Sequence, residues 1–265
     1  VDLYRVHALS ERTSLFGLLG DPALHSLGPC LHNRAFARLG IDAVYLALET
    51  ARPEQVVDLL ALARLRGLSV TSPHKQRAAA ICHALHPPAD ACGAVNTLLF
   101  DDAGAVHGHN TDVEGVRAAL RGAGLTDDGA SHPAAVLGAG GASRAAALAL
   151  EGMGFEVTVV GRDGLTAAAL GDLEPRVVVH ATPVGGAGRP DASATPVPGW
   201  TPVPGASVLD MVYRPEVTPL LRTAAAAGAI AVSGVEMFLA QAAAQLELFV
   251  GRRLAADELR ELLPT

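Results

Sequence analysis

Residues 134–144 carry the pattern in this chain with the clearest chemical meaning. A short apolar run meets a glycine turn, and an alanine-rich stretch follows at once, an order that predicts a strand, a tight turn and a helix. In such a turn Gly138 can adopt a positive φ, and Gly140 lets a ligand approach the backbone because it has no Cβ. The start of the helix adds unpaired N–H groups and the positive end of the helix dipole. The stretch therefore predicts a binding site for a pyrophosphate group.

The match to the dinucleotide-binding pattern G-x-G-x-x-G is incomplete, because Ser143 stands in the place of the third glycine. Glycine turns also join strands to helices for structural reasons alone. A second apolar run, 157–160, follows at the distance that a βαβ unit requires, and it favours the dinucleotide-binding interpretation.

A set of polar residues shares one feature: each lies where an expected strand gives way to a loop or a helix. Ligand-binding groups gather at this place in open α/β sheets, although any one such residue is more simply explained as a loop or capping residue. The set comprises Ser26, Thr71, Lys75, Asn96, Asn110 and Asp112.

Strands and helices are expected to alternate along the whole chain, which indicates an α/β fold. In the first half we expect strands at 14–20, 44–48 and 68–71, helices ending near Leu39 and Arg66, helical turns reaching His86, and a hairpin of 93–100 with 106–108. In the second half we expect strands at 134–137, 157–160, 176–179, 207–211 and 230–232, and helices at 218–227, 237–250 and 256–263.

Composition narrows the class of protein. The chain has 265 residues, enough for one large or two ordinary domains, and its net charge of −7 without a dense basic run argues against nucleic acid as a partner. It contains no run of about 18 apolar residues and opens with no signal peptide, which argues against a membrane location. Its three cysteines show no C-x-x-C spacing. These features favour a reduced, cytoplasmic protein. They do not decide between a monomer and a homodimer.

Several short motifs, taken in order, resemble the shikimate dehydrogenase family, and the resemblance covers nearly the whole chain. They are His25 to Pro29 with His32 and Asn33, Val70 and Thr71 with Pro73 and Lys75, Gly93 to Thr97, Asn110 to Asp112, the turn from Gly138 to Arg144, Ala181 to Pro183, Asp210 to Tyr213, and Gly234 to Met237 with Gln241.

The resemblance implies an N-terminal α/β substrate domain plus a C-terminal Rossmann-like NAD(P)-binding domain. The substrate-binding and catalytic domain would span 1–112, with the C-terminal helical segment 236–265 packing back onto it, and the dinucleotide-binding domain would span 113–235. Hydride would pass between the nicotinamide of NADP(H) and C3 of the substrate ring, interconverting 3-dehydroshikimate and shikimate.

The resemblance also implies site residues. Lys75 and Asp112 would form the catalytic pair, since ketone reduction needs a proton donor and positive charge near the developing alkoxide. The substrate would be held by Ser26, Thr71, Asn96, Asp112, Tyr213 and Gln241. The cofactor would be held by Gly138, Gly140, Gly141, Ala142, Ser143, Arg162, Thr182, Gly234 and Met237. The reaction needs no metal.

Departures from the family pattern leave two questions open. Gly28 stands where the second serine of Ser-x-Ser-Pro is usual, which removes one donor for the substrate carboxylate and opens space at C1; quinate, with its C1 hydroxyl, is therefore the alternative substrate. Asp163 beside Arg162 would repel the 2′-phosphate of NADP or accept from a ribose hydroxyl of NAD, so NADP is expected and NAD stays possible. Ser69 and His74 also replace the usual asparagine and apolar residue.

Three other interpretations remain. A nucleotide-binding sensor without turnover would explain Gly28 and Asp163, but it would have no need of Lys75 and Asp112. Residues 2–5 resemble the linker after a dehydroquinate dehydratase domain in fused enzymes. Metal binding by His107 and His109, or by Cys82, His83 and His86, is disfavoured because neither group has a full ligand set.

Overall fold

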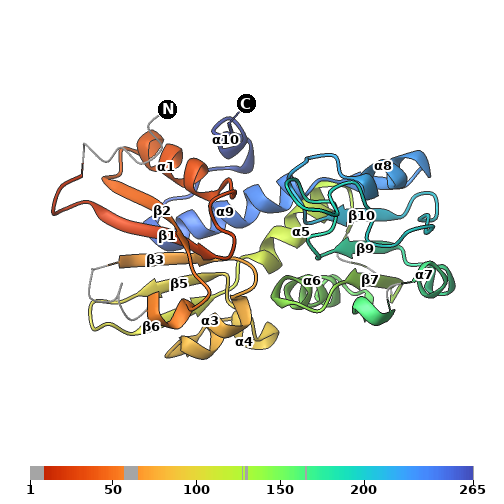
Figure 1. The fold of residues 1–265 in the computed structure, drawn as a ribbon, viewed down its shortest axis with the longest axis horizontal. Helices are drawn as coiled ribbons and strands as arrows, with labels where there is room; N and C mark the ends of the chain where they lie inside the picture. The colour runs from red at the N-terminus through yellow and green to blue at the C-terminus, as the bar shows by residue number, and fades with distance from the viewer. Residues whose placement is uncertain (1–8, 57–64, 127, 129–130, 165, 265) are drawn as a thin grey trace. The chain divides into compact units, whose positions relative to one another are not determined.

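The computed structural model describes residues 9–56, 65–126, 128, 131–164 and 166–264. The chain divides into two compact units, each with its own sheet (Figure 1). The first unit comprises Val1–Thr111 and Ala242–Thr265, and the second comprises Asp112–Gln241. Strands and helices alternate in both units, so the expected α/β class is confirmed.

The first unit is built on a six-stranded mixed sheet of order β2-β1-β3-β5-β6-β4. β1 pairs in parallel with β2 and β3, whereas β5 runs antiparallel to β3 and β6. The strands are β1 (Ser14–Gly20), β2 (Ala43–Glu49), β3 (Leu65–Val70), β4 (Ala84–Leu85), β5 (Thr97–Phe100) and β6 (Val106–His109), and the helices before α9 are α1 (Gly28–Leu39), α3 (Lys75–Ile81) and α4 (Ala89–Cys92).

This topology brings the carboxyl ends of β1, β3 and β6 and the amino end of β5 to one edge of the sheet. Backbone hydrogen bonds join these ends directly: Thr71 N–H donates to Leu19 O at 2.9 Å, Val70 N–H to Asn96 O at 2.7 Å, and Asn96 N–H to His109 O at 3.1 Å. Residues far apart in the sequence therefore meet at this edge.

Aromatic rings form the core on one face of this sheet, from β1, β2, α1 and the end of α9 (Gly234–Val250). Phe249 reaches β3 at Gly67, where an added Cβ would lie 2.6 Å from the Phe249 ring, so only glycine fits without a shift. α10 (Ala256–Arg260) is followed by Leu262, whose carbonyl accepts from Arg34 of α1 at 2.7 Å.

The expected ends of two helices in this unit are wrong. Leu65 and Arg66 begin β3 instead of ending a helix, because Leu65 is buried and pairs with Leu15 of β1; residues 57–64 of that expected helix lie outside the described residues. The expected helical turns up to His86 end at Ile81, and Ala84–Leu85 pair with β6 as a short strand.

The second unit holds a five-stranded, all-parallel sheet of order β11-β10-β9-β7-β8, the arrangement expected of a dinucleotide-binding fold. Its strands are β7 (Pro133–Leu137), β8 (Glu156–Val160), β9 (Val177–His180), β10 (Ser207–Asp210) and β11 (Ile230–Val232). Its helices are α5 (Asp112–Gly122), α6 (Gly141–Glu151), α7 (Ala167–Leu173) and α8 (Pro219–Ala226), with the short 3-10 helix η2 (Arg162–Gly164) after β8 and the start of α9 at the end.

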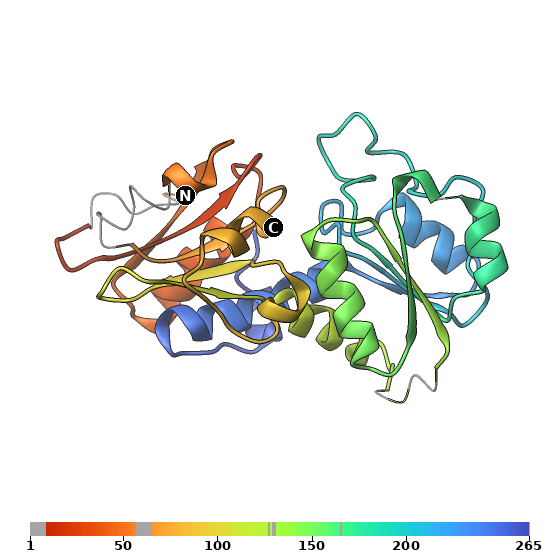
Figure 2. The same cartoon turned by 90° about the horizontal axis from the view of Figure 1, so that it is seen from below.

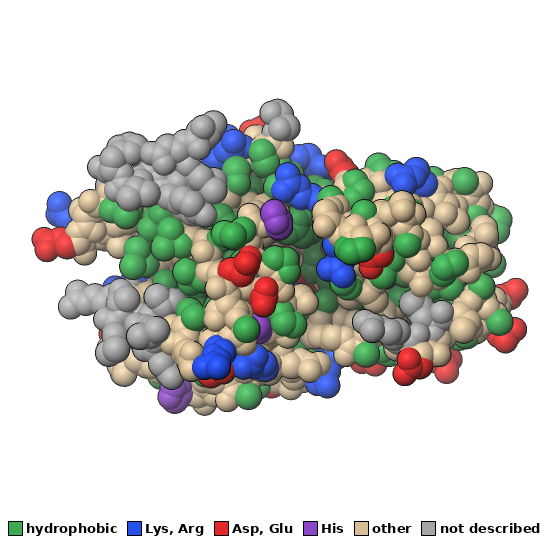
Figure 3. Space-filling model, in the orientation of Figure 1, with side chains coloured by type: hydrophobic (Ala, Val, Ile, Leu, Met, Phe, Trp, Pro, Cys, Tyr) green, Lys and Arg blue, Asp and Glu red, His purple; other side chains and the backbone are tan. Residues whose placement is uncertain are grey.

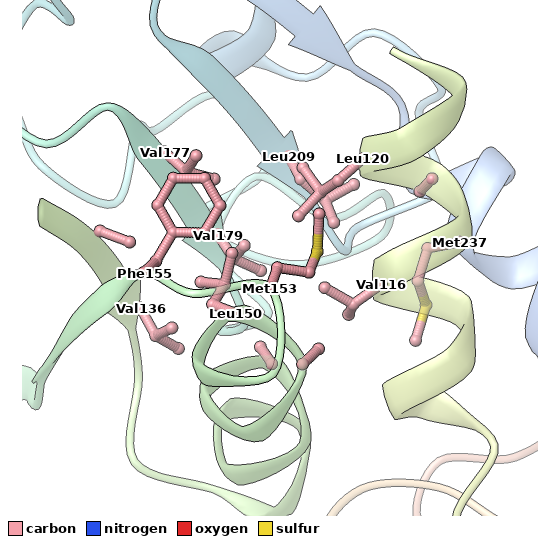
Figure 4. Close-up of a cluster of buried hydrophobic side chains, with 14 of the residues drawn as sticks. Val116, Leu120, Val136, Leu150, Met153, Phe155, Val177, Val179, Leu209 and Met237 are labelled. Carbon is pink, nitrogen blue, oxygen red and sulfur yellow. The ribbon is translucent and has the colours of Figure 1, made fainter. Parts of the chain in front are cut away.

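Helices cover both faces of this sheet (Figure 2), and the side chains of the central strands β7, β9 and β10 alternate between two apolar layers. Val136 and Val179 face the layer that contains Leu150 of α6 and Met153, which follows α6 (Figure 4). Leu137 of β7, Val178 of β9 and Val208 of β10 face the opposite layer, which α7 and α8 cover. The core is built mainly from Ala, Val and Leu, in keeping with the low aromatic content of 4%.

On the face drawn in Figure 3, acidic and basic side chains of the described residues are interspersed. Within the described part of the chain, no helix combines the length and the apolar character needed to cross a membrane.

Candidate active site

The shared edge of the first sheet carries four of the expected site residues: Ser26, Thr71, Lys75 and Asn96. Ser26 follows β1, and its hydroxyl oxygen accepts from Gly28 N–H at 3.1 Å at the start of α1. Lys75 is the first residue of α3, and its carbonyl accepts from Val95 N–H at 2.9 Å, just before β5. The sheet and these two helix starts hold the half-buried side chains of Ser26 and Lys75 at this edge.

The loop after β3 is fixed on both sides. A Cβ at Gly20 would overlap Thr71 Cγ2, so the glycine at the end of β1 makes room for the threonine side chain. His74 is 1% exposed, and its Nε2 hydrogen-bonds the Thr50 carbonyl at 2.7 Å, which ties the loop to the end of β2. His74 therefore supports the segment between Thr71 and Lys75.

Asn96 is buried and is bound to the end of β6. Its Nδ2 donates to Thr111 Oγ1 at 2.8 Å, and its Oδ1 accepts from Thr111 N–H and from the Thr97 hydroxyl, each at 2.8 Å. Thr111 directly precedes Asp112, the first residue of α5, which is 3% exposed. The Asn96 side chain thus fixes the residue before the expected catalytic carboxylate.

Gln245 supports the same edge, and we did not expect it from the sequence. Its Nε2 donates to Asn96 O at 3.2 Å and to Thr97 Oγ1 at 3.0 Å, while its Oε1 accepts from the Ser69 hydroxyl at 2.8 Å. The signal in the sequence is its place one helical turn beyond Gln241.

Gly28 is buried at the start of α1, beside Ser26. A Cβ added there would lie 3.3 Å from Ser26 Oγ and 3.8 Å from Tyr45 Oη. Two hydroxyl oxygens and Leu18 Cδ2, also at 3.8 Å, therefore border the position of the missing side chain.

The glycine turn of the second unit has the expected geometry. Gly138 has φ +125°, a conformation that favours glycine, and Gly140 caps α6 with open space where its Cβ would be. Ser143 is buried, and its Oγ would lie 2.8 Å from a Cβ at Gly138. Ser143, at the third glycine position of the dinucleotide-binding pattern, thus packs against Gly138, at the first. Gly141 and Ala142 belong to the first turn of α6.

Thr182 lies beside this turn, since a Cβ at Gly138 would come within 3.1 Å of Thr182 Cγ2. Its Oγ1 contacts His180 Nε2, and His180 Nδ1 bonds Asp210 Oδ1 at 2.9 Å. We did not expect site roles for His180 or Asp210 from the sequence.

The remaining expected residues of the second unit cluster around the start of α9. A Cβ at Gly234 would lie 2.5 Å from Asp210 O, which explains the glycine by close backbone packing. The Met237 side chain lies in the hydrophobic core, and Tyr213 stacks on Phe238 with ring centroids 4.8 Å apart. Gln241 Nε2 donates to Phe238 O at 3.0 Å.

Arg162 and Asp163 follow β8 at the edge of this sheet, in η2. Asp163 is exposed, and the Arg162 side chain lies outside the described part of the structure.

Three histidines of the first unit pack together on β6 and beside it. His86 Nε2 lies 3.1 Å from His107 Nδ1, and the His86 and His109 rings stack with centroids 4.5 Å apart. Burial, together with the neighbouring imidazoles of His86 and His107, lowers the pKa of His109 to about 4. Among the described residues, no group of three or more His, Cys, Asp or Glu side chains could hold a metal ion.

The expected residues thus fall into two groups. Ser26, Thr71, Lys75 and Asn96 belong to the first unit. The second unit contains Asp112, Tyr213 and Gln241 together with all the expected cofactor residues.

Comparisons with known proteins give a consistent result. The family model described as the shikimate dehydrogenase substrate binding domain matches residues 18–98. The chain is 36% identical to the shikimate dehydrogenase (NADP(+)) of Chlorobium phaeovibrioides, over 95% of this chain and 96% of that protein.

Two solved structures share the fold. The shikimate 5-dehydrogenase of Thermus thermophilus, in complex with NADP(H) and shikimate, is 34% identical, with a TM-score of 0.80 over 94% of this chain and 98% of that one. The enzyme of Listeria monocytogenes, in complex with shikimate and NAD, is 30% identical, with a TM-score of 0.79 over 96% and 98%. This chain belongs to the shikimate dehydrogenase family.

Proposed function

We propose that this protein is an NADP-dependent shikimate dehydrogenase, which reversibly transfers a hydride between NADPH and 3-dehydroshikimate to give shikimate. The observation that carries the proposal is the gathering of Ser26, Thr71, Lys75 and Asn96 at one edge of the first sheet. Family membership indicates that this edge binds the substrate, because the family model that matches residues 18–98 describes a substrate binding domain. The first unit then binds the substrate and the second binds the cofactor.

Lys75 and Asp112 are the proposed proton-transfer pair. As the C3 carbonyl is reduced, negative charge develops on its oxygen, and an ammonium group both stabilises that charge and supplies the proton. The carboxylate of Asp112 holds the ammonium in place and favours its protonated form between turnovers. Asn96, Thr71, Tyr213 and Gln241 orient ring hydroxyls, and Ser26 binds the carboxylate.

The turn at Gly138 fits a dinucleotide. The open space at Gly140, together with the free backbone of the first turn of α6, suits a pyrophosphate at a helix N-terminus. When bound, the cofactor supplies or accepts the hydride. Arg162 is the proposed ligand of the 2′-phosphate, and the exposed carboxylate of Asp163 beside it keeps NAD as the second candidate cofactor.

Quinate is the second candidate substrate, and Gly28 is the observation that favours it. Position 28, beside Ser26 Oγ, lacks the side chain of a serine, and its absence would leave room for an additional hydroxyl at C1 of the ring.

The test is a spectrophotometric assay of NAD(P)H absorbance that crosses shikimate and quinate with NADP and NAD. We expect the highest kcat/KM for shikimate with NADP. Turnover of none of the four pairs by a protein that still binds NADPH would contradict an oxidoreductase and favour a nucleotide-binding sensor. Size-exclusion chromatography of the same sample decides between a monomer and a homodimer. A cytoplasmic location accords with the three cysteines, which form no disulfide.

A further inference from the structure

A row of polar side chains crosses the carboxyl edge of the second sheet and ends at Thr182. Thr218 Oγ1 donates to Asp210 Oδ2 at 2.6 Å, His180 Nδ1 bonds Asp210 Oδ1 at 2.9 Å, and His180 Nε2 contacts Thr182 Oγ1. Thr218, Asp210 and His180 are each 0% exposed, whereas Thr182 is half-buried. The row thus leads from the fully buried start of α8 to a half-buried side chain at the proposed cofactor site.

The donors around Asp210 define the proton positions. Its carboxylate also accepts from Val212 N–H at 3.0 Å, so three donors converge on it, and an ionised carboxylate can only accept. His180 Nδ1–H is thus the donor to Asp210, and with the proton on Nδ1 the other ring nitrogen, Nε2, is an acceptor. The Thr182 hydroxyl consequently donates its single proton to His180.

The Thr182 oxygen is left as an acceptor only. Val184 N–H also points to it, at 3.4 Å, and one lone pair remains. Thr182 follows β9 and lies beside Gly138 of the turn after β7. The strand order reverses at this place, because β8 pairs with one side of β7 and β9 with the other. Ligands of open α/β sheets bind at this point.

We propose that His180 is a positioning residue that holds the Thr182 hydroxyl as a hydrogen-bond acceptor for a donor group of the bound nucleotide, a ribose hydroxyl or the carboxamide. The inference rests on the proposed function, because it takes the nucleotide to bind at this turn. A phosphate oxygen is excluded as the partner, since it would face another acceptor.

Two replacements of His180 separate the two halves of the row. In His180→Asn, the amide nitrogen takes the place of Nδ1, so the donor to Asp210 is kept and the contact with Thr182 is lost. In His180→Gln, the amide reaches the place of Nε2, so Thr182 keeps a partner and Asp210 loses a donor. Thr182→Val removes the hydroxyl at constant shape. Thr223→Val is the matched control, because its half-buried hydroxyl bonds Pro219 O within α8 at 3.1 Å.

Binding of NADPH, followed by its own fluorescence, is the main measurement, with KM for shikimate and the melting temperature alongside. We expect His180→Asn and Thr182→Val each to raise the NADPH Kd about threefold to tenfold, the effect of one ordinary hydrogen bond. The double variant should be no worse than either single variant, and KM for shikimate should stay the same. His180→Gln should lose less affinity than His180→Asn but more thermal stability, and Thr223→Val should bind as the wild type does.

Additive losses in the double variant, or a parallel rise in KM for shikimate, would overturn the proposal in favour of a purely structural role. An unchanged Kd in Thr182→Val would overturn it as well, whether or not the His180 variants fold. The proposed function fails differently, through absent turnover of shikimate and quinate by the wild type.

Discussion

His32 should make the stability of the first unit strongly dependent on pH. The imidazole is 2% exposed, stacks on Tyr45 with ring centroids 4.4 Å apart, and bonds the Gly28 carbonyl through Nδ1 at 3.0 Å. Its Nε2 is buried and has no hydrogen-bond partner among the described residues. Burial lowers the pKa of His32 from 6.5 to about 4, an effect that the hydrogen bond to Gly28 opposes only in part.

The sign and size follow from linkage. Between pH 6.5 and pH 4 the unfolded chain binds a proton at His32 and the folded chain does not, so the free energy of unfolding falls as the pH is lowered through this range. A lowering of the pKa by about 2.5 units corresponds to about 3 kcal/mol, and this stability is fully present only above pH 6.5. His109, whose pKa is also lowered to about 4, acts in the same direction but is only half-buried.

His32→Phe keeps an aromatic ring against Tyr45 and removes the titration. Urea unfolding at about pH 7.5 and about pH 4.5, on either side of most of this transition, is followed by far-UV circular dichroism and by hydrogen exchange of the β1 and β2 amides, which report the first unit. The fluorescence of Trp200, the one tryptophan, reports the second unit instead. His109→Asn is the matched control for an imidazole that is not enclosed.

We expect the wild type to lose about 2–3 kcal/mol more than His32→Phe on acidification, and His109→Asn to remove a smaller part of the loss. If His32→Phe and the wild type lost the same free energy within about 0.5 kcal/mol, an uncertainty typical of extrapolation from urea, then His32 would not be the buried neutral imidazole described here.

Three further predictions concern the reaction. Lys75→Ala should lower kcat by about two to four orders of magnitude, the range for a positioned acid–base group, with a smaller effect on shikimate affinity; near wild-type turnover in steady-state kinetics would remove Lys75 from the mechanism. Gly28→Ser should shift the ratio of kcat/KM for shikimate over quinate upward by about 1.5–3 kcal/mol, one hydrogen bond to a charged group, and an unchanged ratio would make the glycine a loop residue. Arg162→Ala should weaken NADP by about 1.5–3 kcal/mol in binding titrations while NAD changes little, and equal losses for both would indicate a role in the fold.

The sequence was most informative where the structure is determined locally. The strands at Ser14–Gly20 and Ile230–Val232 begin and end where the apolar runs do, and the turn at Gly138 has the predicted positive φ. Family membership, expected from ordered motifs, is confirmed by a relative that is 36% identical over 95% of the chain. The start of β3 was missed because Leu65 belongs to the strand through its pairing with β1, a contact that no local pattern reveals.

The supporting side chains were missed for the same reason. Gln245 reaches Asn96 across 149 positions of the sequence, and Asp210 reaches His180 across 30. A glutamine inside a helix pattern and a histidine at the end of a strand carry no motif of their own. Their contacts arise only when parallel strands and the C-terminal helix bring distant segments together.

The hydrogen bonds around Asn96 distinguish two of the departures from the family pattern, Ser69 and Gly28. Ser69 stands where asparagine is usual, yet its hydroxyl is bound to Gln245, which in turn holds Asn96 and Thr97, so the replacement is absorbed within a complete hydrogen-bond network. Gly28 has no such compensation, since the nearest atoms to its missing side chain are Ser26 Oγ at 3.3 Å and then Leu18 and Tyr45 atoms at 3.8 Å. A replaced residue whose partners are satisfied leaves the surface that a ligand meets unchanged, whereas a lost side chain beside polar atoms alters it. We therefore expect the choice between shikimate and quinate to depend on position 28 and not on position 69.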